Sequence, residues 1–248
     1  MKALITGASS GIGKDMAKYL SKLGYDLVIV ARRKELLEEL SKELNTKVEI
    51  EVCDVSSASN CETLFEKYKD IDVLVNNAGF GTFGNFDETD LSTELNMINT
   101  NIVGLHVLTK LYLKEMVKRN SGHILNVGSL AGFMPGPLMA TYYASKNYVV
   151  ALSRGINKEL SKKKSAVRVS ILCPGPVDTN FNNVAGVKFG IKPLTSEYVA
   201  KYGIDGMFKN KEIIMPGVMN RATRILAKLV PWKVMAEGVY NTQKSKNK

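Results

Sequence analysis

The strongest constraint on the fold is an alternation of short apolar runs with longer stretches of helical spacing. The apolar runs are rich in Val, Ile and Leu, and they occupy residues 2–6, 26–31, 47–52, 71–76, 123–128 and 167–172. Runs that are apolar throughout are typical of parallel strands covered on both faces. Strands that alternate with helices favour right-handed crossovers in one sheet. The pattern therefore predicts an α/β fold: a doubly wound parallel sheet of about seven strands with helices on both faces.

The chain has 248 residues, a length at which α/β folds often form one domain. We find no internal repeat or linker, so residues 1–248 are expected to form a single domain. Between about 178 and 210 the rhythm is broken by glycines, prolines and scattered large apolar residues. A long insertion of this kind is usually functional, so we expect a substrate lid there. Residues from about 218 to 248 are expected to form a basic amphipathic helix and a tail.

The net charge is +10, and much of the excess lies in this C-terminal part. No basic stripe interleaved with aromatic residues accompanies it, so we expect no nucleic-acid partner. A solvated surface is the simplest interpretation of the charge, and weak contact with anionic lipid is the alternative. The basic residues of the tail, which face only Glu237, are Arg221, Arg224, Lys228, Lys233, Lys244, Lys246 and Lys248.

The cysteines and the N-terminus bear on the cellular compartment. Cys53, Cys61 and Cys173 are widely scattered and lack metal-binding spacing, which indicates reduced thiols and no metal site. No charged-then-apolar leader pattern follows Met1, and no apolar stretch approaches the ~20 residues that a membrane span requires. We expect a cytoplasmic protein.

A glycine-rich motif, "TGASSGIG" at 6–13, follows the first expected strand and opens the helix expected at 12–23. Its first glycine permits a tight turn, its second a close approach of backbone to a phosphate, and its third close packing of helix on strand. The N–H groups at the start of the helix suit a pyrophosphate, and two serine hydroxyls add donors. The motif predicts a nucleotide site in a Rossmann-type sheet, lined by Gly7, Ser9, Ser10, Gly11, Ile12 and Gly13.

Three further motifs follow in order along the chain. They are "NNAG" at 76–79, Tyr-x-x-x-Lys at 142–146 and "PGPVDT" at 174–179. Together with the T-G-x-x-x-G-x-G spacing of the first motif, they resemble the short-chain dehydrogenase/reductase family from residue 2 to about 180. The resemblance implies hydride transfer between a nicotinamide cofactor and an alcohol or carbonyl carbon.

Two adjacent tyrosines precede the lysine of this pattern. The pKa of tyrosine is ~10, and a nearby ammonium can lower it enough for acid/base work. Helical spacing alone allows either Tyr142 (i,i+4) or Tyr143 (i,i+3) to meet Lys146. The family pattern selects Tyr142, and Ser129, thirteen residues earlier, matches the position of the catalytic serine. The resemblance implies that Ser129 holds the substrate oxygen and that Lys146 also binds the nicotinamide ribose; Tyr143 is assigned to packing.

The segment "NIVG" at 101–104 resembles an Asn-x-x-Gly motif of the family. The resemblance implies that Asn101 helps to hold a water that links the lysine to bulk solvent. Asn96 and Asn99 lie close by and are alternatives for this role. The expected catalytic residues are Asn101, Ser129, Tyr142 and Lys146.

The end of the second strand bears on which nicotinamide cofactor is used. NAD enzymes carry an acidic residue there for the adenosine ribose, whereas this chain has Ala31 followed by Arg32 and Arg33. A guanidinium binds a 2′-phosphate with geometric fit, so NADP(H) is expected. Some NADP-preferring relatives also have a basic residue where Ser10 stands here, so Arg32 is expected to carry more of the preference. The remaining cofactor contacts implied by the resemblance are Asp54, Val55, Asn77, Gly79, Pro174, Gly175, Val177 and Thr179, besides Tyr142 and Lys146.

The expected substrate pocket is apolar, which suits a carbonyl compound with an apolar body. Because cytosolic NADP(H) is kept reduced, we expect reduction of a ketone to an alcohol. A 3-oxoacyl thioester on an acidic carrier, met by Lys188 and Lys192, is an alternative, as is a non-catalytic NADP(H)-binding sensor or membrane-surface protein. The expected walls are Phe80, Phe83, Phe86, Phe133, Met134, Leu138, Met139, Phe181 and Phe189.

The C-terminal part lacks the Asp-Gly-Gly segment that many family members use in tetramer contacts. We therefore expect a homodimer built on the long helices at 93–119 and 142–161. Val149, Val150 and Leu152 are expected to form its apolar component.

Overall fold

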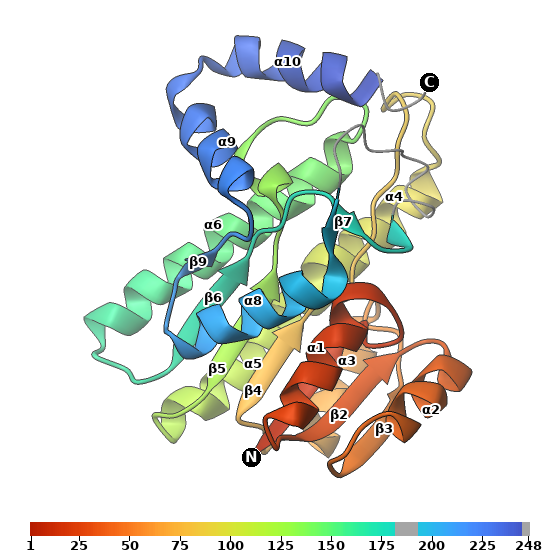
Figure 1. The fold of residues 1–248 in the computed structure, drawn as a ribbon, viewed down its shortest axis with the longest axis vertical. Helices are drawn as coiled ribbons and strands as arrows, with labels where there is room; N and C mark the ends of the chain where they lie inside the picture. Colours follow the sequence, from red (N-terminus) through yellow and green to blue (C-terminus); the bar gives the residue numbers. More distant parts are fainter. Residues whose placement is uncertain (182–192, 245–248) are drawn as a thin grey trace.

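The computed structural model describes residues 1–181 and 193–244. Its centre is a seven-stranded parallel sheet in the order β3-β2-β1-β4-β5-β6-β9 (Figure 1). The strand order reverses between β1 and β4, which makes the sheet doubly wound and confirms the predicted fold class. The strands are β1 (Lys2–Thr6), β2 (Asp26–Ala31), β3 (Val48–Val52), β4 (Val73–Asn76), β5 (His123–Val127), β6 (Arg168–Leu172) and β9 (Ile213–Ile214).

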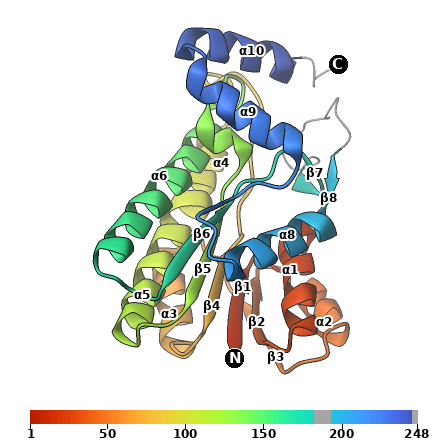
Figure 2. The same cartoon turned by 60° about the vertical axis from the view of Figure 1, so that its left-hand side comes forward.

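Helices cover both faces of the sheet (Figure 2). One face carries α1 (Gly11–Lys22), α2 (Lys34–Lys42) and α8 (Ser196–Phe208). The other carries α3 (Ala58–Lys67), α5 (Leu105–Lys118) and α6 (Ala140–Lys162). The helix α4 (Leu91–Ile98) precedes α5 and contacts α6.

Most of the apolar runs form strands with both faces buried, whereas the edge strand β3, which carries Glu49 and Glu51, is only partly buried. Ala3 and Ile5 of β1 point into the core beneath α1 and α8, whereas Leu4 points into the core beneath α3 and α5. Side chains alternate between the two faces of a strand, so a strand covered on both faces is apolar at most positions.

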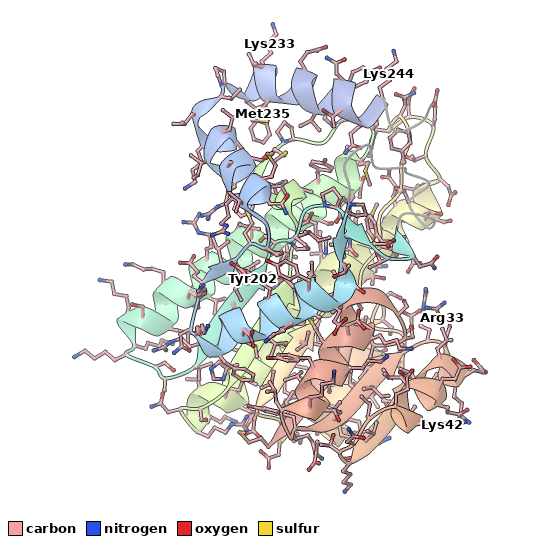
Figure 3. The ribbon with its side chains drawn as sticks, viewed as in Figure 1. Arg33, Lys42, Tyr202, Lys233, Met235 and Lys244 are labelled. Atoms are coloured by element: carbon pink, nitrogen blue, oxygen red, sulfur yellow. The ribbon has the colours of Figure 1, made fainter. Side chains whose placement is uncertain are left out.

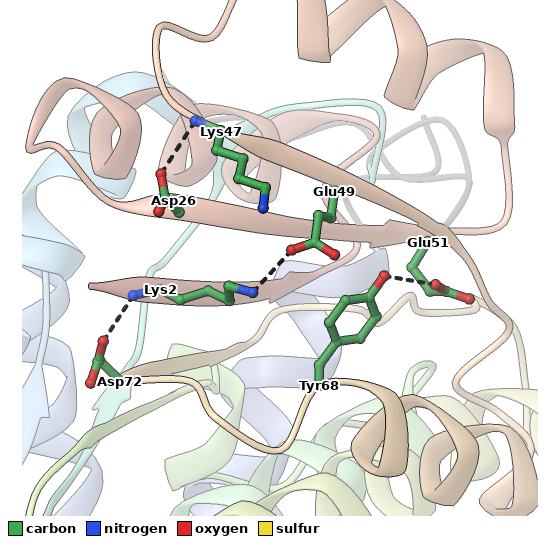
Figure 4. Close-up of polar contacts among 7 residues, drawn as sticks. All are labelled: Lys2, Asp26, Lys47, Glu49, Glu51, Tyr68 and Asp72. Carbon is green, nitrogen blue, oxygen red and sulfur yellow. Dashed lines mark hydrogen bonds and ion pairs between the residues drawn. The ribbon is translucent and has the colours of Figure 1, made fainter.

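Polar contacts tie β1 and the edge strand β3 to the chain around them (Figure 4). The backbone N–H of Lys2 donates to Asp72 (2.8 Å), and its ammonium donates to Glu49 of β3 (2.9 Å). The phenol of Tyr68 donates to Glu51 (3.1 Å). These contacts are partly exposed and each contributes little stability, but they join β1, β3 and β4 in the observed order.

The helix expected at 93–119 contains a π-helical turn, η1 (Asn99–Gly104), between α4 and α5. A Cβ at Gly104 would lie 2.1 Å from the carbonyl oxygen of Val55, so only glycine lets the helix pass this close to the loop after β3. π-Helical turns are frequent at functional sites, and this one carries Asn101.

The prediction of a lid over 178–210 is wrong for its second half. Residues 196–208 form α8, whose Val199, Ile204 and Met207 are buried against the sheet. The glycines taken as loop signals are packing contacts: a Cβ at Gly203 would meet Leu172 at 2.9 Å. The paired strands β7 (Val177–Asp178) and β8 (Leu194–Thr195) flank residues 182–192. Phe189, Lys188 and Lys192 lie outside the described residues.

The apolar component predicted for a dimer is also wrong. Val149 and Val150 are buried within the chain, packed with Ile171 and Cys173. Leu152 is half-buried against the same cluster. These side chains face the sheet because α6 must cover β6, so they are not available to a second copy.

The short strand β9 is followed by the basic helical structure expected from the sequence, which here is two helices. α9 (Val218–Leu229) and α10 (Trp232–Lys244) lie beyond the carboxyl ends of the strands, apart from the layers that cover the sheet (Figures 1 and 2). Within residues 1–181 and 193–244, no helix has both the length and the apolar character needed to cross a membrane.

Candidate active site

The predicted site residues gather at the carboxyl ends of β1, β4, β5 and β6. The sheet order places β1 next to β4, then β5, then β6, so the loops that follow these strands share one edge. In open α/β sheets, ligands bind at this edge, where the strand order reverses.

The glycine motif forms a tight turn between β1 and α1. Gly7 and Gly11 have φ angles of +67° and +55°, a region that side chains other than glycine rarely adopt. A Cβ at Gly13 would lie 2.4 Å from the carbonyl oxygen of Gly7, so this glycine is needed for α1 to start directly on the turn. The side chain of Ser10, at the N-cap, makes no capping hydrogen bond to the first turn of α1. The turn and the helix N-terminus thus fit a pyrophosphate.

The segment after β6 approaches the same turn. A Cβ at Gly11 would lie 3.1 Å from the side chain of Thr179, so "PGPVDT" reaches the phosphate end of the cleft. At the other end of this segment, the carbonyl of Pro174 accepts a hydrogen bond from the N–H of Leu130 (2.8 Å). Pro174 is therefore next to the loop that carries Ser129.

The two arginines after β2 point to different places. Arg33 donates to the hydroxyls of Ser9 (3.1 Å) and Ser10 (3.3 Å) on the glycine turn. The nearest acidic partner of Arg32 is Asp54, at 3.8 Å. Both guanidinium groups are exposed, but Arg33 is the one held against the phosphate-binding turn. This geometry favours Arg33 as the arginine that would meet a 2′-phosphate. From the sequence we expected Arg32 to carry more of the preference for NADP(H).

The "NNAG" loop is attached to the glycine turn. The amide of Asn77 donates to the carbonyls of Thr6 (3.0 Å) and Gly7 (3.2 Å). Its backbone N–H donates to the hydroxyl of Thr6 (3.0 Å). A Cβ at Gly79 would lie 2.8 Å from the side chain of Asn101. The side chain of Asn77 is therefore occupied within the protein, in keeping with the expectation that it meets a cofactor through its backbone.

Ser129, Tyr142 and Lys146 converge as the sequence predicts. The hydroxyl of Ser129 lies near enough to the phenol of Tyr142 to lower its pKa. The ammonium of Lys146 lies 5.8 Å from the centre of the Tyr142 ring and donates to the carbonyl of Val127 (2.9 Å). Lys146 is buried. The three side chains come from the end of β5 and one turn of α6, which is the arrangement a proton donor with two supporting groups requires.

Burial dominates the ionisation of this group. It raises the pKa of Tyr142 to about 12, and the hydrogen bond with Ser129 opposes the rise. Burial also lowers the pKa of Lys146 to about 8. Desolvation of the phenol sets the direction of the Tyr142 shift, so the lowering of its pKa expected from Lys146 is not seen. Tyr142 therefore holds its proton tightly, whereas Lys146 holds its proton loosely.

Asn101 is buried in the π-helical turn, whereas Asn99 is exposed. The amide of Asn101 donates to the carbonyl of Phe80 (2.9 Å) and to the hydroxyl of Ser145 (3.1 Å). Its carbonyl oxygen accepts from the N–H of Phe80 (3.1 Å). Of the three asparagines considered, Asn101 is therefore the one that joins the loop after β4 to α6, next to the lysine.

Tyr143 points away from the catalytic group. Its ring lies against Gly136, where a Cβ would meet the ring at 2.0 Å. Its phenol accepts a hydrogen bond from the amide of Gln243 in α10 (2.7 Å). The geometry of Tyr143 is that of a packing residue that anchors the C-terminal helix.

Sequence reasoning missed a group of polar residues, of which Glu94 is buried, that hold the start of α6 in place. The carboxylate of Glu94 accepts from Thr141 (2.8 Å) and Thr89 (2.7 Å), which fixes the start of α6 beside Tyr142. The amide of Asn147 donates to the carbonyls of Ala131 (3.1 Å) and Met134 (3.2 Å). No local sequence signal marks them, because Thr89 and Glu94 lie in a polar stretch and their partner Thr141 is far along the chain.

The predicted apolar walls are partly brought together. Phe83, Met139 and Phe181 pack with Tyr142 and Tyr143 in one cluster. Phe86 is 69% exposed, so its assignment to the pocket is wrong: it lies in the turn before α4 and points to solvent. Phe133 packs beneath Arg224 of α9 (5.1 Å).

Comparison with known proteins agrees with this site. Residues 1–189 match the family model described as short chain dehydrogenase. The chain belongs to this family, and it is an oxidoreductase of the type that uses a nicotinamide cofactor.

Two curated relatives and one solved structure illustrate the likeness. The chain is 34% identical to very-long-chain 3-oxoacyl-CoA reductase-B of Danio rerio, over 96% of this chain and 80% of that protein. It is 33% identical to an NADP-dependent 3-hydroxy acid dehydrogenase of Schizosaccharomyces pombe, over 86% of this chain and 88% of that protein. A short-chain dehydrogenase from Sphingobium yanoikuyae in complex with NADPH superimposes with a TM-score of 0.80 at 28% identity, covering 93% and 96% of the two chains.

Proposed function

We propose that this protein is an NADP(H)-dependent reductase that converts a ketone with an apolar body into a secondary alcohol. The observation that carries the proposal is the grouping of Ser129 and Tyr142 beside the buried ammonium of Lys146. Such a group can protonate a carbonyl oxygen. The "NNAG" loop lies between this group and the nucleotide turn, since Gly79 approaches Lys146 and the amide of Asn77 donates to Gly7.

Each residue has a distinct role in this proposal. The bound nicotinamide cofactor supplies the hydride to the carbonyl carbon. Tyr142 donates its phenolic proton to the carbonyl oxygen, and the Ser129 hydroxyl donates a hydrogen bond to the same oxygen. Lys146 stabilises the phenolate that Tyr142 becomes, which compensates for the burial that raises the tyrosine pKa. Asn101 holds the loop at Phe80 against α6, so that Lys146 keeps its position.

The preference for NADP(H) is proposed from the charge around the glycine turn. β2 ends at Ala31 instead of an acidic residue, which removes a repulsion of the 2′-phosphate. Arg33 is already held at the turn by Ser9 and Ser10. The NADPH complex of the Sphingobium yanoikuyae relative and the NADP dependence named for the Schizosaccharomyces pombe relative support this choice.

A second candidate substrate class is a 3-oxoacyl thioester. It is favoured by the identity with the 3-oxoacyl-CoA reductase of Danio rerio, which extends over nearly the whole chain. The reacting group is a ketone in either case, so the roles of Ser129, Tyr142 and Lys146 are the same. The apolar cluster of Phe83, Met139 and Phe181 suits an aryl or polycyclic ketone and an acyl chain equally.

A cytoplasmic location and a homodimer stay predictions. Because Val149 and Val150 are buried in the chain, a dimer on α6 has to use exposed positions such as Ala151 and Gly155.

The proposal is tested by following cofactor oxidation with a panel of ketones. The panel contains aryl ketones, polycyclic ketones and 3-oxoacyl thioesters, each offered with NADPH and with NADH. We expect turnover of at least one ketone class with NADPH, and slower turnover with NADH. NADPH binding without oxidation by any ketone of the panel argues for the non-catalytic sensor instead.

A further inference from the structure

The C-terminal helix α9 presents its apolar side to solvent. A helix on a globular protein normally turns its apolar stripe toward the core. In α9 the arrangement is reversed: Leu229 is 77% exposed, and no residue of the helix is fully buried. The exposed apolar side chains of this end of the molecule are Val218, Met219, Ile225, Leu226 and Leu229 of α9, with Trp232 and Val234 of α10.

The inward side of α9 is the polar one. Asn220 lies against Gly175, where a Cβ would meet its amide oxygen at 2.3 Å. Arg224, four residues on, lies over the ring of Phe133 at 5.1 Å. With about 100° of rotation per residue, Val218, Ile225, Leu226 and Leu229 share one side of the helix, opposite the side that holds Asn220 and Ala227. The apolar side is therefore continuous and lacks a partner among the described residues.

Positive charge borders this apolar side. Between Ile213 and Ala236 the chain has four basic residues and no acidic one. Arg221 and Lys228 are exposed along one edge of the apolar side of α9. Lys233 projects outward from α10, as does Lys244 at its end (Figure 3). An apolar strip beside lysine and arginine, with a tryptophan at its end, is the composition of a helix that lies in a membrane interface.

We propose that α9 and the start of α10 form a docking surface for an anionic lipid bilayer. The apolar side chains of α9 and Trp232 enter the headgroup region, while Arg221, Lys228 and Lys233 meet lipid phosphates. The contact is peripheral, since neither helix can span a bilayer.

The charge pattern favours a bilayer over a second copy of the chain. An isologous dimer on this surface would bring Arg221, Lys228 and Lys233 of one copy against the same residues of the other. No acidic residue of α9 is available to pair with them, because the nearest one along the chain beyond α9 is Glu237 of α10. An anionic bilayer complements these charges, with about 1 kcal/mol contributed by each basic residue near its surface.

The surface lies at the same end of the molecule as the catalytic group. α9 contacts the loop after Ser129 through Arg224 and Phe133, and α10 contacts Tyr143 through Gln243. A molecule docked through α9 therefore holds the end that carries Ser129 and Tyr142 toward the lipid. This placement agrees with an apolar substrate, but lipid binding is independent of the reductase activity proposed above.

The test uses the full chain and vesicles, without cofactor or substrate. Trp232 is the only tryptophan of the chain and is 66% exposed, so its fluorescence reports directly on this surface. The vesicles are phosphatidylcholine alone, or phosphatidylcholine with about one-third phosphatidylglycerol. We expect a blue shift of the emission and cosedimentation with the anionic vesicles, and at least tenfold weaker binding to phosphatidylcholine alone or at high salt.

Substitutions test whether this surface, and not another part of the molecule, binds the vesicles. Leu226→Glu with Leu229→Glu should abolish binding, and Lys228→Glu with Lys233→Glu should weaken it at least tenfold. The matched control is Leu91→Glu with Leu95→Glu on α4, where Leu91 is 69% exposed. This control carries the same charge change and should bind as the native chain does. Circular dichroism and thermal unfolding confirm that each variant is folded.

Three results would overturn the proposal. One is the absence of binding to anionic vesicles by the folded native chain. Another is equal loss of binding in the control on α4. The third is a dimer of the native chain that dissociates in the Leu226→Glu, Leu229→Glu variant without any binding to vesicles, which would assign the surface to a second copy.

Discussion

At the scale of single residues, two adjacent tyrosines have different partners. Tyr142 meets Ser129 and Lys146, whereas Tyr143 is turned about one quarter of a helical turn away and meets Gln243, one hundred residues further along the chain. Spacing along the helix could not distinguish them, because both lie within one turn of the lysine. The partners that do distinguish them come from β5 and α10.

The buried lysine predicts a dependence of stability on pH. The unfolded chain keeps the Lys146 proton up to a pH of about 10.5, whereas the folded protein releases it near a pKa of about 8. Between these values the unfolded state binds more protons, so the free energy of unfolding rises with pH. Relative to Lys146→Met, the native protein should gain on the order of 2 kcal/mol between pH 7 and pH 10.

Urea unfolding of both proteins at the two pH values measures this gain. Subtracting the unfolding free energy of Lys146→Met from that of the native protein removes the contributions of the other titrating groups. These include Tyr142, whose pKa in the folded protein is about 12. A difference in unfolding free energy that does not change with pH would show that Lys146 is not desolvated as the structure indicates.

The arginine pair predicts unequal effects on cofactor preference. Arg33→Ser should lower the ratio of kcat/KM for NADPH to that for NADH by about 10- to 100-fold, since a charged hydrogen bond contributes about 1.5–3 kcal/mol. Arg32→Ser should have a smaller effect, because Arg32 points toward Asp54. Lys34→Ser, at the start of α2, is the neighbouring control. Steady-state rates with both cofactors show which substitution changes the ratio more. A larger effect of Arg32→Ser would mean that Arg32 carries more of the preference for NADPH, as the sequence led us to expect.

At the scale of elements, strands and motifs were predictable, but the roles of several glycines were not. The inner strands are recognisable because they are almost continuously apolar, and the glycine turn, "NNAG" and "PGPVDT" follow such strands closely. Gly203 looked like a loop signal, yet it lies in α8 because only glycine fits against Leu172. Likewise, Val149 and Val150 looked free for a partner because a sequence does not show which side of a helix faces the sheet.

Two helical glycines give a matched pair of predictions about stability. Gly104→Ala would place a Cβ 2.1 Å from the Val55 carbonyl oxygen, and overpacking of this kind costs about 1–3 kcal/mol or more. Gly155→Ala in α6 meets nothing within 4 Å. It should stabilise the protein by about 0.5–1 kcal/mol through helix propensity. Urea midpoints of the two variants measure both effects, and similar midpoints would mean that the π-helical turn can move away from β3.

At the scale of the whole molecule, the proposed cofactor should stabilise the folded chain. A ligand that binds only the folded state contributes about 2.7 kcal/mol at one hundred times its Kd. For a chain of 248 residues this corresponds to a rise in Tm of roughly 5–10 °C. NADPH at such a concentration should raise Tm more than NADH at the same concentration. Equal shifts, measured by differential scanning fluorimetry, would contradict the proposed preference.

The contacts that the sequence could not reveal are those between parts far apart in the chain. Gln243 on Tyr143, Glu94 on Thr141 and Thr179 beside Gly11 are set by how the layers pack, and no local pattern records them. Motif positions were accessible because the glycine turn, "NNAG", Ser129 and "PGPVDT" follow strands whose order the fold class predicts.

A comparison of Tyr142→Phe with Tyr143→Phe in ketone reduction by NADPH tests whether Tyr142 is the proton donor. Both changes remove one phenolic hydroxyl from a neighbouring position of α6, so each is the control for the other. Loss of the proton donor should lower kcat for Tyr142→Phe by about 10²- to 10⁴-fold while NADPH binding is retained. Tyr143→Phe should keep kcat within a few-fold. Full activity in Tyr142→Phe, or loss only in Tyr143→Phe, would contradict the assignment of Tyr142 as the proton donor.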